Sequence, residues 1–176
     1  MMKKNSRVSQ LLGIEYPVLL APMSWVTDAR LVAAVSEAGG LGIFGPNAGQ
    51  TEVTTDPLEG KERMRREIAK ARELTKKPLG AELLWAGSTS IFAEHLADLY
   101  CECDDISVVL CLNDVPQIYV DRLHEAGKIC IHKDIFASVE SFKIAEDMGY
   151  DAVVVAGVDG GGHSNRKKAG TFTAIR

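Results

Sequence analysis

Residues 151–163 read DAVVVAGVDGGGH, an apolar run that leads directly into a glycine-rich turn and a histidine. Consecutive valines at 153–155 are typical of a strand covered on both faces, as in a parallel sheet. Ligands of parallel α/β folds bind at the carboxyl ends of the strands, where this turn falls. Three glycines leave the backbone open to a planar or phosphorylated ligand beside the titratable ring of His163. The stretch predicts a ligand site, and a plain Asp-Gly turn with a solvated histidine is an equally good interpretation of these residues alone.

Outward from this stretch, strand-like apolar runs alternate with helix-like periodic segments along the whole chain. The alternation is typical of βαβ units that build a parallel α/β sheet. Successive strands begin roughly 22 to 38 residues apart, which is enough for one helix and two short loops. A doubly wound sheet and a barrel both fit, and no linker divides residues 1–176, so we expect a single domain. The predicted strands are 18–20, 41–44, 79–84, 106–110, 128–131 and 152–156.

The segments between these strands carry helix signals. Asp28 is expected to cap a helix that stops at Gly39, and Asp56 caps a second helix that has proline at its first position. Ser138 is expected to cap the last helix, which Gly149 ends. Apolar stripes at helical spacing are formed by Leu31, Ala34, Val35 and Ala38; by Met64, Ile68 and Ala71; by Phe92, Leu96 and Leu99; by Tyr119, Leu123 and Ala126; and by Phe142, Ala145 and Met148.

Composition excludes several classes of protein. With 46% hydrophobic and 25% charged residues among 176, the chain has the composition of a globular protein. A net charge of −4 argues against nucleic-acid binding, which needs a dense basic face. There is no apolar run of membrane-spanning length and no secretion signal, so we expect a cytoplasmic protein without a membrane partner. The four cysteines have neither zinc nor redox spacing and are expected to be reduced packing residues, and no metal site is predicted.

A second motif lies near the N-terminus, where residues 13–23 read GIEYPVLLAPM. Pro22 fixes the chain where a strand stops, and the soft thioether of Met23 suits contact with an aromatic ring, with core packing as the alternative interpretation of Met23. Together with AAVSEAGGLG at 33–42 and GYDA followed by GGH within 149–163, this motif resembles the nitronate monooxygenase family and the related FMN-dependent enoyl-acyl-carrier-protein reductases. The segment RELTKKPLG at 72–80 is similar to the family's approach to its third strand.

The resemblance implies a TIM-barrel type fold that holds FMN non-covalently at its carboxyl-end mouth. It implies that His163 removes a proton α to a nitro group or polarises the substrate, which suits a ring that titrates near neutral pH. His132, at the end of a predicted strand, is a further candidate for ligand contact. The other residues implied to contact or approach the flavin are Ala21, Pro22, Met23, Gly157, Gly161 and Gly162.

The chain also departs from the family pattern. Glu82 stands where the family commonly has asparagine, and a carboxylate there would disfavour an anionic reduced flavin unless it points into the barrel wall or to solvent. Ala156 replaces a polar residue before the loop, and Ser164 replaces a glycine after the histidine. About six of the eight expected (βα) units can be traced. We therefore expect an incomplete barrel, truncated at its C-terminus and without the usual phosphate-binding half.

Three functions follow as hypotheses. The first is FMN-dependent oxidation of alkyl nitronates or nitroalkanes with dioxygen, by a monooxygenase that takes a small nitro compound. The second is reduction of an enoyl thioester by FMN and a nicotinamide. The third is an inactive fragment with a structural or interaction role, because the exposed edges of an open sheet favour pairing with another chain, such as a second copy.

Overall fold

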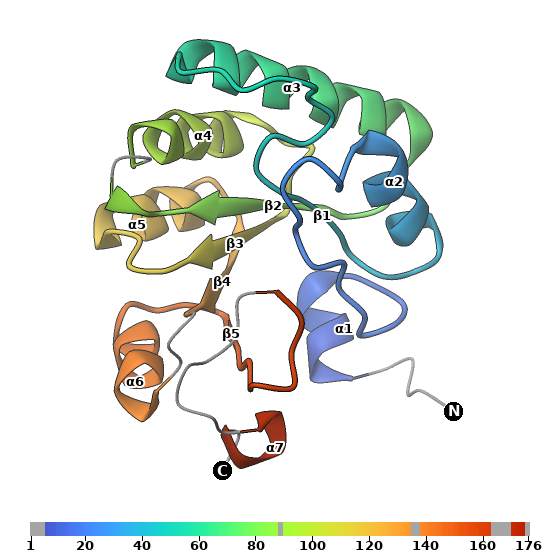
Figure 1. Ribbon diagram of the computed structural model, residues 1–176. Helices are drawn as coiled ribbons and strands as arrows, with labels where there is room; N and C mark the ends of the chain where they lie inside the picture. Colours follow the sequence, from blue (N-terminus) through green and yellow to red (C-terminus); the bar gives the residue numbers. More distant parts are fainter. Residues whose placement is uncertain (1–5, 88–89, 135–137, 163–169, 175–176) are drawn as a thin grey trace.

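A five-stranded parallel sheet in the order β1-β2-β3-β4-β5 forms the centre of the computed structural model (Figure 1). The structure describes residues 6–87, 90–134, 138–162 and 170–174. Its strands are β1 (Gly42–Phe44), β2 (Leu79–Leu84), β3 (Val108–Leu112), β4 (Ile129–Lys133) and β5 (Ala152–Val154). Strands that neighbour one another in chain order are arranged as in TIM-barrel type (βα) units, whereas a doubly wound sheet reverses its order.

Helices alternate with the strands as the sequence predicts. They are α1 (Arg7–Leu12), α2 (Ala29–Glu37), α3 (Pro57–Leu74), α4 (Ser90–Glu102), α5 (Gln117–Glu125), α6 (Val139–Asp147) and α7 (Thr171–Ala174). The predicted caps are confirmed, because Asp28, Asp56 and Ser138 each accept a hydrogen bond from a backbone N–H in the first turn of their helix.

The predicted strand at 18–20 is present as a single parallel bridge between Leu19 and Leu41. Leu41 N donates to Val18 O, and Leu20 N donates to Leu41 O, both at 2.9 Å. Pro22 lacks a backbone N–H, which limits how far such a ladder can extend. The described residues therefore hold five strands and one bridge where six strands were predicted.

The expectation that the valine-rich strand is covered on both faces is wrong. Within the described part of the chain, β5 pairs with β4 and with no other strand, and the Val153 side chain is 40% exposed. Ala152 and Val154 are half-buried and pack against the inner apolar cluster. A continuous apolar run thus marks a strand at the edge of the described sheet, with one side open.

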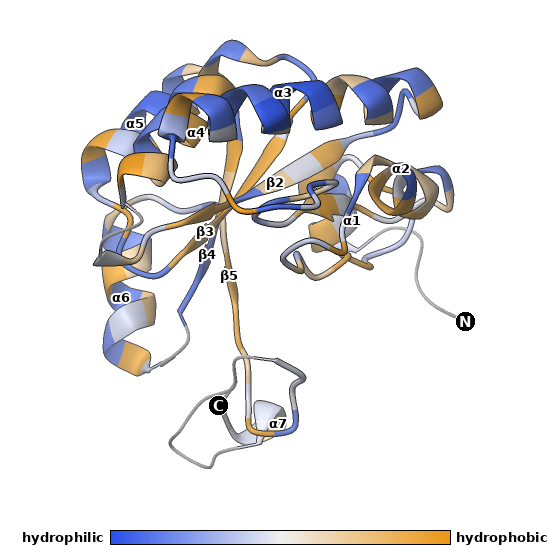
Figure 2. Cartoon of the chain, turned by 45° about the horizontal axis from the view of Figure 1, so that its top comes forward, coloured by the Kyte–Doolittle hydropathy of each residue, from blue (hydrophilic) through white to orange (hydrophobic). Residues whose placement is uncertain are grey.

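One face of the sheet is covered by helices. Helix α2 packs on β1, α4 on β2 and α5 on β4, while α3 lies across α2 and α4 (Figure 1). The core between these layers includes Ile68, Leu83, Tyr100 and Leu123, which are fully buried. Figure 2 shows that α3 presents a largely hydrophilic surface, whereas the strands beneath it are largely hydrophobic. Helix α1 lies on the opposite, inner side of the sheet.

Helix α2 turns a different stripe inward from the one that the sequence predicts. Val32 and Ala33 are buried, as are Ala29 and Ser36, whereas the predicted Ala34 is exposed. Its stripe-mates Leu31 and Val35 are half-buried and Ala38 is exposed. Almost every position of this helix is apolar or small, so periodicity cannot choose the face. Contact chooses it, because Gly42 has no side chain and the backbone of Val32 packs directly against it.

The remaining predicted stripes hold to different degrees. Met64, Ile68 and Ala71 of α3 are all buried, so that stripe is confirmed. In α4, α5 and α6 the predicted Leu99, Leu123 and Ala145 are buried and the other predicted members are half-buried. All four cysteines are free thiols, as predicted, with Cys111 and Cys130 buried and Cys101 and Cys103 half-buried.

Candidate functional site

An apolar cavity of about 360 Å³ opens on the inner face of the sheet. It lies between α1, the segment that follows the Leu19 bridge and the strands β3 to β5. Its lining includes Leu11, Ala21, Pro22, Leu110, Ile131 and Val154, with Lys133 as the charged residue. Ligand sites are typically apolar concavities in which a few polar groups orient the ligand, so this cavity is the candidate site.

The segment Ala21–Met23 borders this cavity. Ala21 and Pro22 line it directly, and the backbone of Met23 rests on the carboxyl end of β1. Gly45 permits that approach, because a Cβ at Gly45 would lie 2.6 Å from Met23 N. The Met23 side chain is 40% exposed, which does not fit the alternative that it serves core packing. Two of the three predicted residues therefore meet at the cavity, and the third lies beside it.

Glu82 lies on the cavity side of β2. It is in register with Leu110, which is in register with Ile131, and neighbours in register point to the same face of a parallel sheet. The side chain is 7% exposed, and no described residue forms a hydrogen bond to its carboxyl group. Burial raises the pKa of Glu82 to about 7, against the opposing attraction of Lys133. The chain thus places a carboxyl group that titrates near neutrality on its inner face.

Lys133 lines the cavity, and the sequence did not single it out. It ends β4 two positions after Ile131, and alternation along a strand puts both side chains on the inner face. Its ammonium group is the positive charge of an otherwise apolar cavity, so it is suited to an anionic ligand. Strand alternation indicates it once Ile131 is known to face inward.

His132 is placed on the opposite face from the cavity, which corrects the expectation that it faces the ligand. It is in register with Cys111 on the helix-covered side, and its ring packs against Tyr150 with 5.1 Å between centroids. Both ring nitrogens are buried, and no described residue forms a hydrogen bond to them. Burial lowers the pKa of His132, which favours the neutral form of the ring. Successive side chains of β4 point to opposite faces of the sheet, so Lys133 reaches the cavity and the neighbouring His132 does not.

The glycine-rich loop after β5 is held by hydrogen bonds to Thr171, the first residue of α7. The Asp159 carboxylate accepts hydrogen bonds from the backbone N and the hydroxyl of Thr171, both at 2.8 Å, and these bonds lower the pKa of Asp159. Gly157 N donates to the same hydroxyl at 3.1 Å. Gly157 is therefore buried against Gly170 and Thr171 and not at the cavity.

The predicted Gly161 and Gly162 are exposed, and a Cβ added at either would meet nothing within 4 Å. Their backbone is open to a ligand, as the sequence predicts of this turn. His163 lies outside the described residues.

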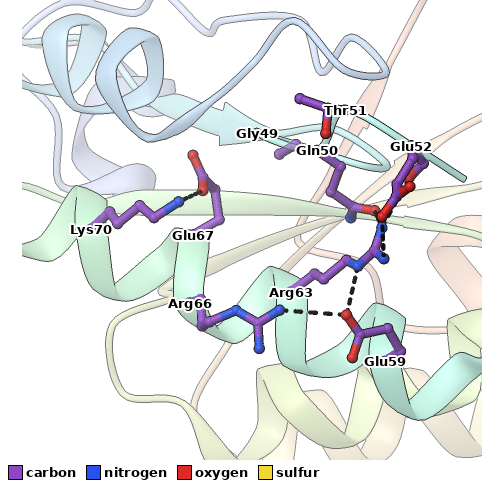
Figure 3. Close-up of a pocket in the computed structure, with 10 residues that line it drawn as sticks. Gly49, Gln50, Thr51, Glu52, Glu59, Arg63, Arg66, Glu67 and Lys70 are labelled. Carbon is purple, nitrogen blue, oxygen red and sulfur yellow. Dashed lines mark hydrogen bonds and ion pairs between the residues drawn. The ribbon is translucent and has the colours of Figure 1, made fainter. Parts of the chain in front are cut away.

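A second cavity, of about 300 Å³, is polar and lies between α3 and the loop after β1 (Figure 3). Arg63 Nε lies 2.7 Å from a Glu59 oxygen, and Lys70 Nζ lies 2.8 Å from a Glu67 oxygen. Arg66 also reaches Glu59, at 3.5 Å. Each of these cations is thus already paired with a carboxylate, which makes the polar cavity a poor site for an anionic ligand.

Two further findings bear on the kind of site. No helix in the described ranges is long and apolar enough to cross a membrane. Within the same ranges, no group of three or more His, Cys, Asp or Glu side chains could hold a metal ion.

The strand order defines an α/β protein of TIM-barrel type, and the apolar cavity on the inner face of its sheet is the candidate ligand site. Residues 5–176 match the family model described as nitronate monooxygenase. The chain belongs to the nitronate monooxygenase family.

Individual relatives agree with this membership. A Mycobacterium tuberculosis protein named (3aS,4S,5R,7aS)-5-hydroxy-7a-methyl-1-oxo-octahydro-1H-indene-4-carboxyl-CoA dehydrogenase is 32% identical over 93% of this chain and 41% of its own length. A probable nitronate monooxygenase of Staphylococcus aureus is 28% identical over 92% of this chain and 51% of its own length.

Solved structures give the same fold. FabK from Thermotoga maritima superposes with a TM-score of 0.76 and 33% identity, over 92% of this chain and 47% of that one. A nitroalkane oxidase from Streptomyces ansochromogenes has a TM-score of 0.70 over 92% of this chain and 52% of that one, and its 22% identity supports the fold alone. The chain spans about half the length of the relatives it matches.

Proposed function

We propose that residues 1–176 form a single FMN-binding domain of a flavin-dependent oxidoreductase that oxidises alkyl nitronates or nitroalkanes with dioxygen. The observation that carries this proposal is the apolar cavity on the inner face of the sheet, which is lined by the family-motif residues Ala21 and Pro22. Family membership supports the class of chemistry. A cytoplasmic location stays a prediction.

The described residues fit a flavin in two respects. The cavity wall is apolar, as a flat aromatic ring requires. The backbone at Gly161 and Gly162 is open, with no side chain in the way. When bound, the flavin would accept the electrons of the oxidation.

The chain's own charged groups have roles in this proposal. The Lys133 ammonium would attract the anionic nitronate. Glu82 would hold a proton at its carboxyl group below about pH 7 and release it above that value. The role of His163 in removing a proton from the substrate stays a prediction from the family resemblance.

An absorbance titration tests the proposal. FMN added to the purified chain should show a perturbed band between about 350 and 500 nm, since both enzyme hypotheses need a bound flavin. Bleaching of the bound flavin by an alkyl nitronate without oxygen, and recovery on admission of air, is the result expected for the monooxygenase. A spectrum that stays that of free FMN would contradict the proposal and favour an inactive role, with a second copy as one possible partner.

A thioester substrate is the second candidate. It is supported by the relative that is 32% identical over 93% of this chain, which is named for a coenzyme A thioester. An enoyl-thioester reductase would use a nicotinamide to reduce the same flavin. Rapid anaerobic bleaching by NADH or NADPH, with no bleaching by the nitronate, would select this candidate.

A further inference from the structure

Thr27 joins the cavity segment to the sheet through its hydroxyl group. The side chain is fully buried, at 0% exposure. The hydroxyl donates to Met23 O at 3.0 Å and accepts from Gly45 N at 2.7 Å and from Met23 N at 3.3 Å. A threonine hydroxyl has one donor and two acceptor positions, so the hydrogen-bonding capacity of Thr27 is fully used. One side chain therefore connects the residue after Pro22 with the carboxyl end of β1.

The turn that Thr27 closes is held in an unfavourable backbone conformation. Trp25, within this turn, has a φ of 69°, which is uncommon for a residue with a bulky side chain. Trp25 N donates to Pro46 O at 3.1 Å, and Thr27 N donates to Met23 O at 3.2 Å. Such a conformation persists only where surrounding contacts determine it. The hydroxyl of Thr27 is the side-chain group that fixes both sides of this turn.

We propose that Thr27 is a positioning residue of the ligand site, which holds the segment Ala21–Met23 where Ala21 and Pro22 line the cavity. In taking the ligand to be FMN, the inference rests on the proposed function. In this proposal, a buried side chain that does not itself contact the ligand determines the position of the cavity wall.

The hydroxyl and not the shape of Thr27 carries this role. In Thr27→Val the volume is kept, but Gly45 N loses its acceptor in a buried position, which is costly. Met23 O retains the backbone donors Val26 N and Thr27 N, so the turn itself survives. The expected consequence is separation of the turn from β1. Thr27→Ser keeps the hydroxyl and should preserve the attachment.

Thr75 offers a matched control at the other end of the sheet. It is also buried, at 3% exposure, and its hydroxyl bonds to a Glu37 carboxylate oxygen and accepts from Lys77 N at 3.0 Å. It precedes β2 and is remote from the carboxyl ends of the strands. Thr75→Val makes the same chemical change and should lower the melting temperature without altering the cavity wall.

The experiment measures FMN affinity by absorbance and amide hydrogen exchange at Met23 and Gly45 for each variant. Thr27→Val should weaken FMN binding about tenfold or more, as expected when the buried Gly45 N is left without its acceptor. It should speed exchange at Gly45 by a similar factor. Thr27→Ser should restore both values to within about threefold of wild type, and Thr75→Val should leave both within about twofold.

Unchanged FMN affinity and unchanged exchange in Thr27→Val would overturn the inference. If the wild-type chain binds no FMN, the proposed function fails, while exchange at Gly45 still decides whether Thr27 fixes the turn. Gly45→Ala is a second variant that disturbs the same contact from the sheet side, because its Cβ would press on the backbone of Met23. It should mimic Thr27→Val in both measurements, and wild-type values would count against the inference even if Thr27→Val did not fold.

Discussion

The polar and the apolar cavity are similar in size, at about 300 and 360 Å³, and opposite in construction. In the polar cavity each cation faces a carboxylate, and Glu67 also accepts a hydrogen bond from Ala29 N at 2.8 Å, at the start of α2. In the apolar cavity Lys133 is the charged lining residue, and the Glu82 carboxyl lies buried on the same face. The polar cavity, which is dense in paired charges, therefore belongs to the structural scaffold. The apolar cavity, which has few charged groups, is the candidate site.

Hydrogen bonds at the start of α2 link residues of the two cavities. The Glu67 carboxylate fixes the first residue of the helix, Asp28 caps it, and Thr27 immediately before the cap fixes Met23. The polar cavity thus holds the element on which the wall of the apolar cavity depends. A change in the polar cavity should alter stability, and a change in the apolar cavity should alter ligand binding.

The largest expected effect comes from the packed layer against which both regions rest. Leu83 is fully buried between the sheet and the helices, whereas Leu11, at the apolar cavity, is 37% exposed. Leu83→Ala should lower the free energy of unfolding by about 2–5 kcal/mol. Leu11→Ala should cost clearly less, because it removes fewer buried contacts. Urea unfolding of both variants checks this, and equal losses would mean that the inner face is as well packed as the outer face.

The next effect concerns the carboxyl group of Glu82. Its pKa in the folded state is about 7, raised above the ordinary value of 4.5 by burial. A raised pKa means that the contribution to stability is present below pH 4.5 and is lost as the pH rises through 7. The loss should be on the order of 3 kcal/mol.

Unfolding of wild type and Glu82→Gln at pH 5 and pH 8 tests this prediction. The Gln variant should lose much less stability between these values, and Glu62→Gln, on the exposed surface of α3, should behave as wild type. The same pH dependence in wild type and Glu82→Gln would place the titration elsewhere.

A smaller effect is expected at the polar cavity. Glu67 is 4% exposed, and its removal leaves Ala29 N without an acceptor and Lys70 without its partner. Glu67→Ala should therefore destabilise the fold by about 1–3 kcal/mol. Glu62→Ala on the same helix should cost at most about 0.5 kcal/mol, as expected of an exposed ion pair. If Glu67→Ala instead abolished ligand binding without loss of stability, the polar cavity and not the apolar cavity would be the ligand site.

The smallest expected effect on stability comes from a variant that tests which of the two cavities binds the ligand. Lys133→Met keeps most of the side-chain length and removes the charge, so stability should change by less than about 0.5 kcal/mol. Nitronate binding should weaken about tenfold, because the cavity loses its positive charge. Arg66→Met in the polar cavity is the control and should bind as wild type. Equal binding by both variants would show that Lys133 does not meet the ligand.

Much of the fold was predictable because its signals are local. The strand 79–84 has the predicted bounds, and α3 buries the predicted Met64, Ile68 and Ala71, since a capped helix with one apolar stripe has one way to pack. The same reasoning predicted the wrong buried face for α2. This helix is apolar on most sides, and its buried face is chosen by Gly42 and by Glu67, a residue 38 positions away.

The site was predictable in part for the same reason. Ala21 and Pro22 belong to a local motif, and they do line the cavity. His132 and Lys133 could not be told apart without knowing the phase of β4, which neighbouring strands determine. Thr27 carries no sequence signal of its own role, because its hydroxyl bonds to Gly45, a residue distant in the chain.

The most direct test is a titration of FMN into the wild-type chain and into Leu110→Trp, followed by flavin absorbance and fluorescence. Leu110 lines the apolar cavity, so the larger side chain should fill it. The account predicts saturable binding to wild type, with a perturbed flavin spectrum, and loss of that binding in a folded Leu110→Trp. Free-FMN spectra for wild type up to about 1 mM, or undiminished binding by Leu110→Trp, would contradict the claim that the apolar cavity is a flavin site.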